Sequence, residues 1–180
     1  MTIDVQPTLV GELCNLRPLR REDYAAVWKI ASDPRVWEQH PAWDRYQEPI
    51  FKKLFEESMD SSGCLVIRDN ETDEIIGSSR YWGHDEALSE IEIGWTFIAP
   101  KYWGGAYNRE IKQLMLSHIF QFVDRVIFKV GVKNFRSQRA MEKIGGRQAG
   151  LSEDTGGNAS FVYESLKQDF DIRGQKRSQQ

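Results

Sequence analysis

Two adjacent glycines stand directly before a predicted helix in the segment KYWGGAYNREIK, residues 101–112. A helix begins with backbone N–H groups that have no partner within the helix, and its dipole makes that end electropositive. Gly104 and Gly105 lack a Cβ, so the backbone can approach a ligand closely and direct several N–H groups at phosphate oxygens. The segment therefore predicts a site for a pyrophosphate. An ordinary tight turn, in which the glycines supply positive φ angles and bind nothing, is the alternative that the segment alone leaves open.

The segment differs from the nucleotide-binding loops that have a fixed spacing. The sequence contains no GxxxxGK[ST], and no GxGxxG follows the first predicted strand. The glycine pair also follows the fourth predicted strand instead of opening the chain. An enzyme that binds ATP or NAD through such a loop is therefore disfavoured.

Apolar residues at strand and helix spacing indicate the elements that must position this segment. The order is strand, two helices, three strands, helix, strand, helix and two strands. The predicted strands are residues 13–19, 64–69, 74–82, 91–98 and 125–132, with two more between 147 and 166. The predicted helices are residues 24–31, 48–59, 109–123 and 136–144. Asn134 is the predicted N-cap of the last helix, which ends at Gly145 and Gly146.

Composition and charge limit the class of protein. With 180 residues, the chain is expected to form one domain over residues 1–180, with residues 168–180 as a polar, flexible tail. The net charge of −3 and the mixing of basic with acidic residues disfavour a nucleic acid partner. The sequence does not open with a basic stretch followed by an apolar one, and no window approaches the ~18 apolar residues of a membrane span. We expect no membrane partner and a cytoplasmic location.

The cysteines and histidines follow no disulfide or metal-binding pattern. Cys14 and Cys64 lie in apolar or strand-like segments without CxxC spacing, so they are expected to be small buried side chains. His40 and His84 are expected in loops and His118 on the flank of a helix. No metal site is predicted from such scattered residues.

Three segments resemble the GNAT acyltransferase superfamily. Residues 101–106 have the spacing of its acetyl-CoA motif, in which Gln or Arg, two residues, Gly, one residue and Gly or Ala precede a helix, although Lys101 replaces the usual first residue. The segment NFRSQRAMEKIGG, residues 134–146, resembles the Asn-x-x-Ser…Ala-Met-x-Lys-x-Gly signature of the RimJ/RimL-like branch. The segment LRPLRREDYAAVWKIASDPRVW, residues 16–37, resembles the first strand and helix of that branch.

The resemblance implies a layered α+β (α/β/α) fold. Its central sheet is mixed and mostly antiparallel, with about seven strands that splay apart between the fourth and the fifth. The resemblance also implies direct transfer of an acyl group, most simply acetyl, from acetyl-CoA to a primary amine in a ternary complex, with no metal. The pantetheine arm would pair with the backbone of Phe97 and Ile98, near a bulge at Gly94, and the pyrophosphate would lie on the N–H groups of residues 103–108. The cofactor-binding residues implied in this way are Phe97, Ile98, Lys101, Trp103, Gly104, Gly105, Ala106, Tyr107, Asn108, Asn134 and Ser137.

Glu92 is the first candidate for a general base. A primary alkylamine has a pKa near ~10.4, so a base or a water chain must remove a proton before the amine becomes a nucleophile. Alternation along the strand sends Ile91 and Ile93 to one face and Glu92 to the other, where Glu92 could face the cleft near the thioester. A solvated strand carboxylate is the alternative. Glu90 and His84 are the next candidates.

Ser137 and Asn134 each have two readings. The Ser137 hydroxyl either serves the first turn of its helix or donates a proton to the leaving thiolate, as its place in the motif implies. Asn134 is either an N-cap alone or an N-cap that also bonds the pantetheine arm, and the motif favours the second. No Ser-His-Asp order indicates a covalent nucleophile.

The acceptor is expected to be an amine-bearing small molecule or a protein N-terminus. It would meet the segment VWEQHPAWDRY, residues 36–46, where aromatic walls and carboxylates suit an amine cation. For Trp37 and Trp43 individually, plain packing is the competing explanation. A monomer or a homodimer is expected. The functional alternative from another class is a non-catalytic CoA-binding sensor or partner-binding module.

Overall fold

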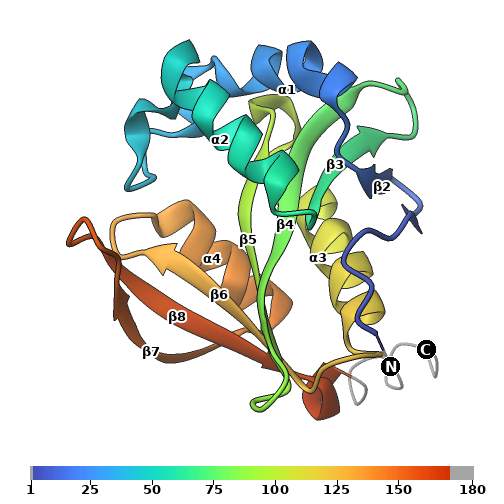
Figure 1. The fold of residues 1–180 in the computed structure, drawn as a ribbon, viewed down its shortest axis with the longest axis vertical. Helices are drawn as coiled ribbons and strands as arrows, with labels where there is room; N and C mark the ends of the chain where they lie inside the picture. Colours follow the sequence, from blue (N-terminus) through green and yellow to red (C-terminus); the bar gives the residue numbers. More distant parts are fainter. Residues whose placement is uncertain (1, 171–180) are drawn as a thin grey trace.

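The computed structural model describes residues 2–170, in which eight strands form one sheet with the order β1-β2-β3-β4-β5-β6-β8-β7 (Figure 1). The strands are β1 (Leu9–Val10), β2 (Cys14–Pro18), β3 (Cys64–Asp69), β4 (Ile75–Asp85), β5 (Glu90–Ile98), β6 (Arg125–Gly131), β7 (Arg147–Glu153) and β8 (Ala159–Leu166). The helices are α1 (Tyr24–Ala31), α2 (Glu48–Asp60), α3 (Ala106–Ile119) and α4 (Phe135–Ile144). Four short 3-10 turns join them, namely η1 (Arg21–Asp23), η2 (Pro34–Val36), η3 (Trp43–Tyr46) and η4 (Pro100–Tyr102).

The predicted strands and helices are confirmed. The structure differs from the expectation by an additional strand near the N-terminus and at the start of the C-terminal tail. The sheet has eight strands instead of about seven, because Leu9–Val10 pairs with β2 as an edge strand too short to show alternation. Of the tail expected at residues 168–180, the part up to residue 170 continues a helical turn, and the Phe170 ring packs 5.3 Å from that of Phe120. The remainder of that tail lies outside the described residues.

The sheet opens between β5 and β6, as predicted. Every other pair of neighbouring strands is antiparallel, whereas β5 and β6 are parallel and pair only from Glu90 to Glu92 with Arg125 to Ile127. Beyond these residues the two strands separate, as the view of Figure 1 shows. The separation leaves one edge of each strand without a partner strand.

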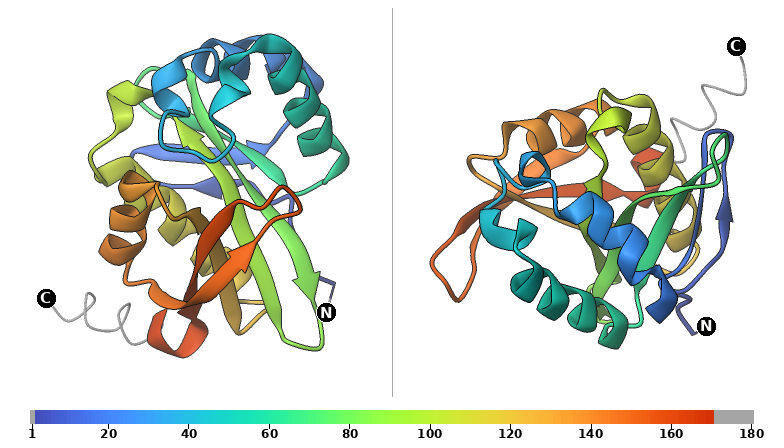
Figure 2. Two further views of the ribbon diagram at one scale, coloured as in Figure 1. Left: turned by 90° about the vertical axis from the view of Figure 1, so that its left-hand side faces the viewer. Right: turned by 90° about the horizontal axis from the view of Figure 1, so that it is seen from above.

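The core lies on both faces of this sheet. α1 and α2 cover one face, and α3 and α4 lie on the other (Figure 2). Along β5, Ile91 and Ile93 belong to the core under α3, whereas Phe97 belongs to the core under α1 and α2. This switch of face follows from a β-bulge in β5, where Trp95 has a φ of +50° and the pairing with β4 shifts by one residue. The predicted bulge at Gly94 is therefore one residue away from the observed one.

Two further expectations concern side chains and membranes. Cys14 and Cys64 are both free and buried, as predicted. No helix within residues 2–170 is long and apolar enough to cross a membrane.

Candidate active site

A cleft of about 570 Å³ lies where β5 and β6 separate. Its walls come from the segment between η2 and η3, from β5 and β6, from the start of α3 and from α4. The parallel pairing that ends at Glu92 thus creates the cleft, and the bulge in β5 shapes one wall.

The glycine turn before α3 opens onto this cleft. Gly104 has a φ of +110° and Gly105 a φ of +128°, so the glycines do supply the positive φ angles of a turn. A Cβ on Gly104 would meet no atom within 4 Å, which means that the space in front of it is free. Among the described residues, no amide from Gly104 to Asn108 donates to a carbonyl or a side chain. Trp103 differs, because its amide donates to the Pro100 carbonyl at 3.2 Å, so the row of free amides begins at Gly104.

Basic side chains gather around the same turn. Arg109, Arg136, Arg139 and Lys143 all line the cleft, and the Lys143 Nζ lies 3.8 Å from the position that a Cβ on Gly105 would take. Sequence reasoning missed this group because it judged charge over the whole chain. Positions 136, 139 and 143 follow the i, i+3, i+7 spacing of one helix face, and this spacing could have revealed them.

Three of the predicted cofactor residues do not line the cleft. Lys101 is exposed, with its ammonium 5.1 Å from the centroid of the Tyr102 ring. The Tyr107 hydroxyl donates to Asp69 Oδ1 at 2.6 Å, and this bond raises the pKa of Tyr107 to about 12. Ala106 is exposed outside the cleft. Tyr107 and Ala106 could contribute only their amides to a ligand there, and Lys101 has no contact with the cleft.

The backbones of Phe97 and Ile98 face opposite ways. Phe97 pairs with Ser78 of β4, and its ring packs 5.0 Å from that of Trp37. The Ala99 amide donates to the Ile76 carbonyl, so alternation along the antiparallel pair directs the N–H and C=O of Ile98 away from β4. Of the two predicted residues, only Ile98 therefore has backbone groups on the open edge of β5, and its carbonyl also accepts the Trp103 indole N–H at 2.9 Å.

Glu92 is buried beside the cleft, with 8% of its surface exposed, and it is not itself one of the lining residues. A solvated carboxylate, the alternative reading, is therefore wrong. Its Oε2 lies 2.9 Å from the Lys129 Nζ on β6, and its Oε1 lies 3.2 Å from the position that a Cβ on Gly94 would take. Lys129 and Gly94 both line the cleft. The other candidates are placed differently, because Glu90 is paired with Arg125 and His84 is exposed near the end of β4.

Asn134 and Ser137 both line the cleft at the start of α4. Asn134 is the N-cap, as predicted, and its Oδ1 accepts the Ser137 amide at 3.1 Å. Within residues 2–170 the Ser137 hydroxyl makes no hydrogen bond. The first turn of α4 is therefore capped by Asn134, and the Ser137 hydroxyl is available to a ligand.

Lys112 is a cleft residue that sequence reasoning missed. Only 3% of its surface is exposed, and its Nζ donates to Thr96 Oγ1 at 2.6 Å and to Ser79 Oγ at 3.4 Å. No carboxylate lies within 4.0 Å of it among the described residues, and burial lowers the pKa of Lys112 to about 7. Position 112 is three residues before the buried Met115, so helical spacing could have placed it beside the apolar stripe.

Of the Trp and Tyr residues in the segment 36–46, where the acceptor was expected to bind, only Trp37 lines the cleft. Trp37 is buried, and its indole N–H donates to the Ala31 carbonyl at 2.7 Å. Trp43 is 58% exposed and does not line the cleft. Plain packing is thus the main role of Trp37, although one edge of it reaches the cleft. His40 of the same segment lines the cleft, and burial lowers the pKa of His40 to about 3.

Comparisons with known proteins agree with this geometry. The chain is similar to a GNAT-family acetyltransferase from Bacillus anthracis, with 22% identity, a TM-score of 0.75 and coverage of 90% of this chain and 99% of that one. A putative acetyltransferase from T. thermophilus has 26% identity, a TM-score of 0.74 and coverage of 94% and 96%. Mycobacterium smegmatis RimJ in complex with CoA-disulfide has 20% identity, a TM-score of 0.72 and coverage of 91% and 88%. No curated protein sequence matches the chain significantly.

The family comparison covers most of the chain. Residues 14–147 match the acetyltransferase (GNAT) domain. This range runs from β2 to the first residue of β7 and includes every element that lines the cleft. The chain is an acetyltransferase of the GNAT family.

Proposed function

We propose that this protein transfers the acetyl group of acetyl-CoA to a primary amine while both substrates are bound in the cleft. The observation that carries the proposal is the turn before α3, whose amides from Gly104 to Asn108 have no partner among the described residues and adjoin the cleft between β5 and β6. Bound acetyl-CoA supplies an activated acyl thioester at one end and phosphates at the other.

The residues around the cleft fit a long anionic ligand. Free amides at a helix N-terminus bind phosphate oxygens, and the side chains of Arg109, Arg139 and Lys143 add positive charge beside them. The outward-facing N–H of Ile98 suits a carbonyl of a pantetheine arm, which would lie along β5 like an added strand, while the Ile98 carbonyl is engaged by the Trp103 indole. The similarity to RimJ, which was solved with CoA-disulfide, supports this ligand and the RimJ/RimL-like branch.

Orientation is the first contribution of the chain to catalysis. Holding the amine and the thioester in line replaces a bimolecular encounter with a nearly unimolecular step, worth up to roughly 7–11 kcal/mol in well-oriented systems. Glu92 accepts the proton that the amine must lose, directly or through water. The ammonium of Lys129, 2.9 Å from the carboxylate, holds Glu92 in place beside the cleft.

Ser137 acts on the leaving group of the reaction. Its hydroxyl, which makes no hydrogen bond within residues 2–170, donates a proton to the leaving sulfur. Asn134 fixes the position of Ser137 through the N-cap bond at 3.1 Å. The acceptor is an amine-bearing small molecule or a protein N-terminus.

Release of free thiol from acetyl-CoA tests the proposal. The full chain is incubated with acetyl-CoA and a panel of N-terminal peptides, polyamines, aminoglycosides and free amino acids, and the acetylated product is identified by mass. We expect release that depends on one class of amine. Tight acetyl-CoA binding without product from any amine would instead indicate a CoA-binding module, and a rise in Tm with ATP or NAD but not with CoA would contradict the ligand itself.

A further inference from the structure

One side of the cleft, formed by η3 and β5, presents Arg45, and a second arginine, Arg80 on β4, is buried outside the cleft lining. Arg45 lines the cleft, with its guanidinium carbon 5.5 Å from the centroid of the Trp37 ring. Arg80 is only 3% exposed and stacks 4.3 Å from the centroid of Trp95, which also lines the cleft. Burial, and then the positive charge of Arg80, lower the pKa of Arg45 to about 10. The positive charge of Arg80 thus acts on Arg45, which faces the cleft.

Neither arginine has a carboxylate partner in the part of the chain that the structure describes. No carboxylate oxygen there lies within 4.0 Å of either one. Arg80 donates from Nη2 to Ser58 Oγ at 2.8 Å, and its Nε is buried without any hydrogen-bond partner. A cation without a counter-charge is costly to bury, so an anion bound in the cleft beside Arg45 would be favourable, although the buried Nε of Arg80 lies out of its reach.

Arg45 and His40 present two donors to the same place. The Ala42 amide donates to His40 Nδ1 at 2.9 Å, and burial keeps the ring neutral by lowering the pKa of His40 to about 3. The proton of the neutral ring must then be on Nε2. Nε2 lies 3.4 Å from Arg45 Nη1, and neither group can accept from the other. An oxygen acceptor placed beside both N–H groups would satisfy them.

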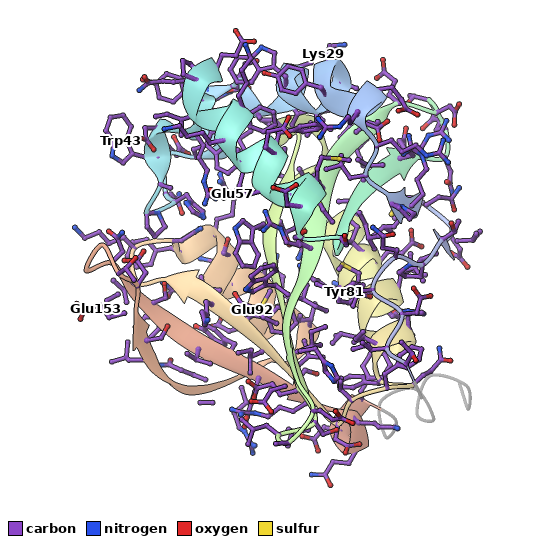
Figure 3. All side chains as sticks on the ribbon, in the orientation of Figure 1. Lys29, Trp43, Glu57, Tyr81, Glu92 and Glu153 are labelled. Atoms are coloured by element: carbon purple, nitrogen blue, oxygen red, sulfur yellow. The ribbon has the colours of Figure 1, made fainter. Side chains whose placement is uncertain are left out.

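The nearest acidic residues do not fill this role. Burial lowers the pKa of Arg80, and the charges of Glu57 on α2 and Glu92 on β5, both labelled in Figure 3, only oppose this shift, since neither carboxylate lies within 4.0 Å of the Arg80 nitrogens. Glu57 is exposed, and Glu92 is already paired with Lys129. Asp44 and Glu57 also act on Arg45 through their charge, but neither lies within 4.0 Å of it, so an anion in contact with Arg45 has to come from a bound molecule.

An aromatic surface lies next to the two arginines. Trp82 is two residues after Arg80 on β4, so both side chains lie on the same face of the sheet. Trp82 is 47% exposed, and its ring packs edge-on at 6.2 Å from that of Trp95. Trp95, which unlike Trp82 lines the cleft, could hold an apolar or aromatic side chain of the same molecule.

We propose that the acceptor is a small amine that also carries a carboxylate, such as a free α-amino acid with an apolar side chain. Arg45 and His40 hold the carboxylate, Arg80 adds positive charge from outside the cleft lining, and the amine lies toward Glu92 and the thioester. This inference rests on the proposed acetyl transfer. Polyamines and aminoglycosides would place further positive charge beside two guanidinium groups, and a peptide N-terminus would place a neutral amide there.

A matched series of acceptors tests the inference on the unaltered protein. L-phenylalanine, L-phenylalaninamide and phenethylamine share a ring and an amine and differ only in the carboxylate. We expect kcat/KM for the amino acid to exceed that for the other two by about 10- to 100-fold, the range of hydrogen bonds to charged groups. The amide has the less basic amine, so a preference for the acid cannot come from a larger fraction of free base. Calorimetry of the same three compounds with the CoA-bound protein should show the same order of affinity.

The variant Arg45→Gln is expected to remove most of this preference. The control Arg35→Gln changes an exposed arginine that is paired with Asp33 outside the cleft, and it should keep the preference. Equal turnover of the acid and the amide would overturn the inference while leaving acetyl transfer intact. Absence of product with every amine, in protein that binds acetyl-CoA, would overturn the proposed function, and the calorimetric comparison of acid with amide would still decide the anion site.

Discussion

The guanidinium of Arg136 lies over the Trp103 ring, with its central carbon 3.9 Å from the ring centroid. The Trp103 indole donates to the Ile98 carbonyl at 2.9 Å, and Arg136 Nη2 donates to the Val36 carbonyl at 3.0 Å. These contacts join α4, the segment before α3, and η2. All four residues line the cleft, so the stacked pair fixes the distance between its walls.

Trp103→Leu should weaken acyl-CoA binding by roughly tenfold, because it removes a cation–π contact worth ~1–2 kcal/mol and the bond to Ile98. Calorimetric titration of acetyl-CoA measures this change. Trp43→Leu, which alters an exposed tryptophan outside the cleft, should leave the affinity unchanged. An unchanged affinity in folded Trp103→Leu would mean that the stacked pair has no part in binding.

Gly104→Val should weaken acyl-CoA binding by about 10- to 100-fold, as expected for the loss of one or two charge-assisted bonds. The branched Cβ would occupy the free space in front of the turn, where no protein atom lies within 4 Å. A valine at position 104 would also be strained by the φ of +110°, and this strain would lower the stability of the fold independently of ligand binding. Gly83→Val shares that effect at a φ of +64° outside the cleft, and it should lower Tm without changing the affinity.

Glu92→Gln should lower kcat about 10²- to 10⁴-fold at saturating acetyl-CoA, the usual contribution of a general base. Binding of acetyl-CoA should persist, because Gln keeps the shape of the side chain. Glu90→Gln is the matched control, since Glu90 is also a strand carboxylate with a basic partner, but that partner, Arg125, does not line the cleft, whereas Lys129 does. A pH–rate profile that is the same in Glu92→Gln as in the wild type would remove Glu92 from the mechanism.

Ser137→Ala should leave Tm nearly unchanged and lower kcat. The helix cap depends on the Ser137 amide and Asn134 Oδ1, so the hydroxyl contributes nothing to it. Asn134→Ala should by contrast cost about 1 kcal/mol of unfolding free energy, the usual value of an N-cap. If Ser137→Ala lowers Tm as much as Asn134→Ala and keeps full kcat, the hydroxyl has only a structural role.

Lys112→Met should change how stability depends on pH. The pKa of Lys112 in the folded chain is about 7, below the ordinary lysine value near ~10.4. Between these values the unfolded chain holds a proton that the folded chain has released. The free energy of unfolding therefore rises with pH in this window by up to about 1.4 kcal/mol per unit.

Denaturant unfolding of wild type and Lys112→Met from pH 6 to pH 9 checks this prediction. The stability of the Met variant relative to wild type should be greatest at pH 6 and should decline as the pH rises. Lys53→Met, at an exposed position of α2, should run parallel to wild type. Parallel curves for Lys112→Met as well would show that Lys112 keeps its proton throughout.

Local patterns predicted most of the fold, because the spacing of apolar residues determines which face of a helix or strand is buried. The Asn134 cap was also predicted, because it joins two residues only three positions apart in the sequence. The ion pair between Glu92 and Lys129 was not predicted from the sequence. Lys129 becomes a neighbour of Glu92 only because the chain passes through α3 from β5 to the parallel strand β6. The electrostatic effect of Arg80 on Arg45 depends in the same way on tertiary packing. The bulge at Trp95 was missed by one residue because a positive φ at tryptophan has no local signal.

The three residue pairs that join β5 to β6 have a mechanical consequence. Within residues 2–170, strands β1 to β5 form one half of the sheet and β6 to β8 the other, and this short junction is the only strand pairing between them. A molecule bound in the cleft between β5 and β6 would contact both halves of the sheet at once. Occupancy should therefore slow hydrogen exchange in β6 and β8, so that the rigidity of the C-terminal strands reports on whether the enzyme is loaded.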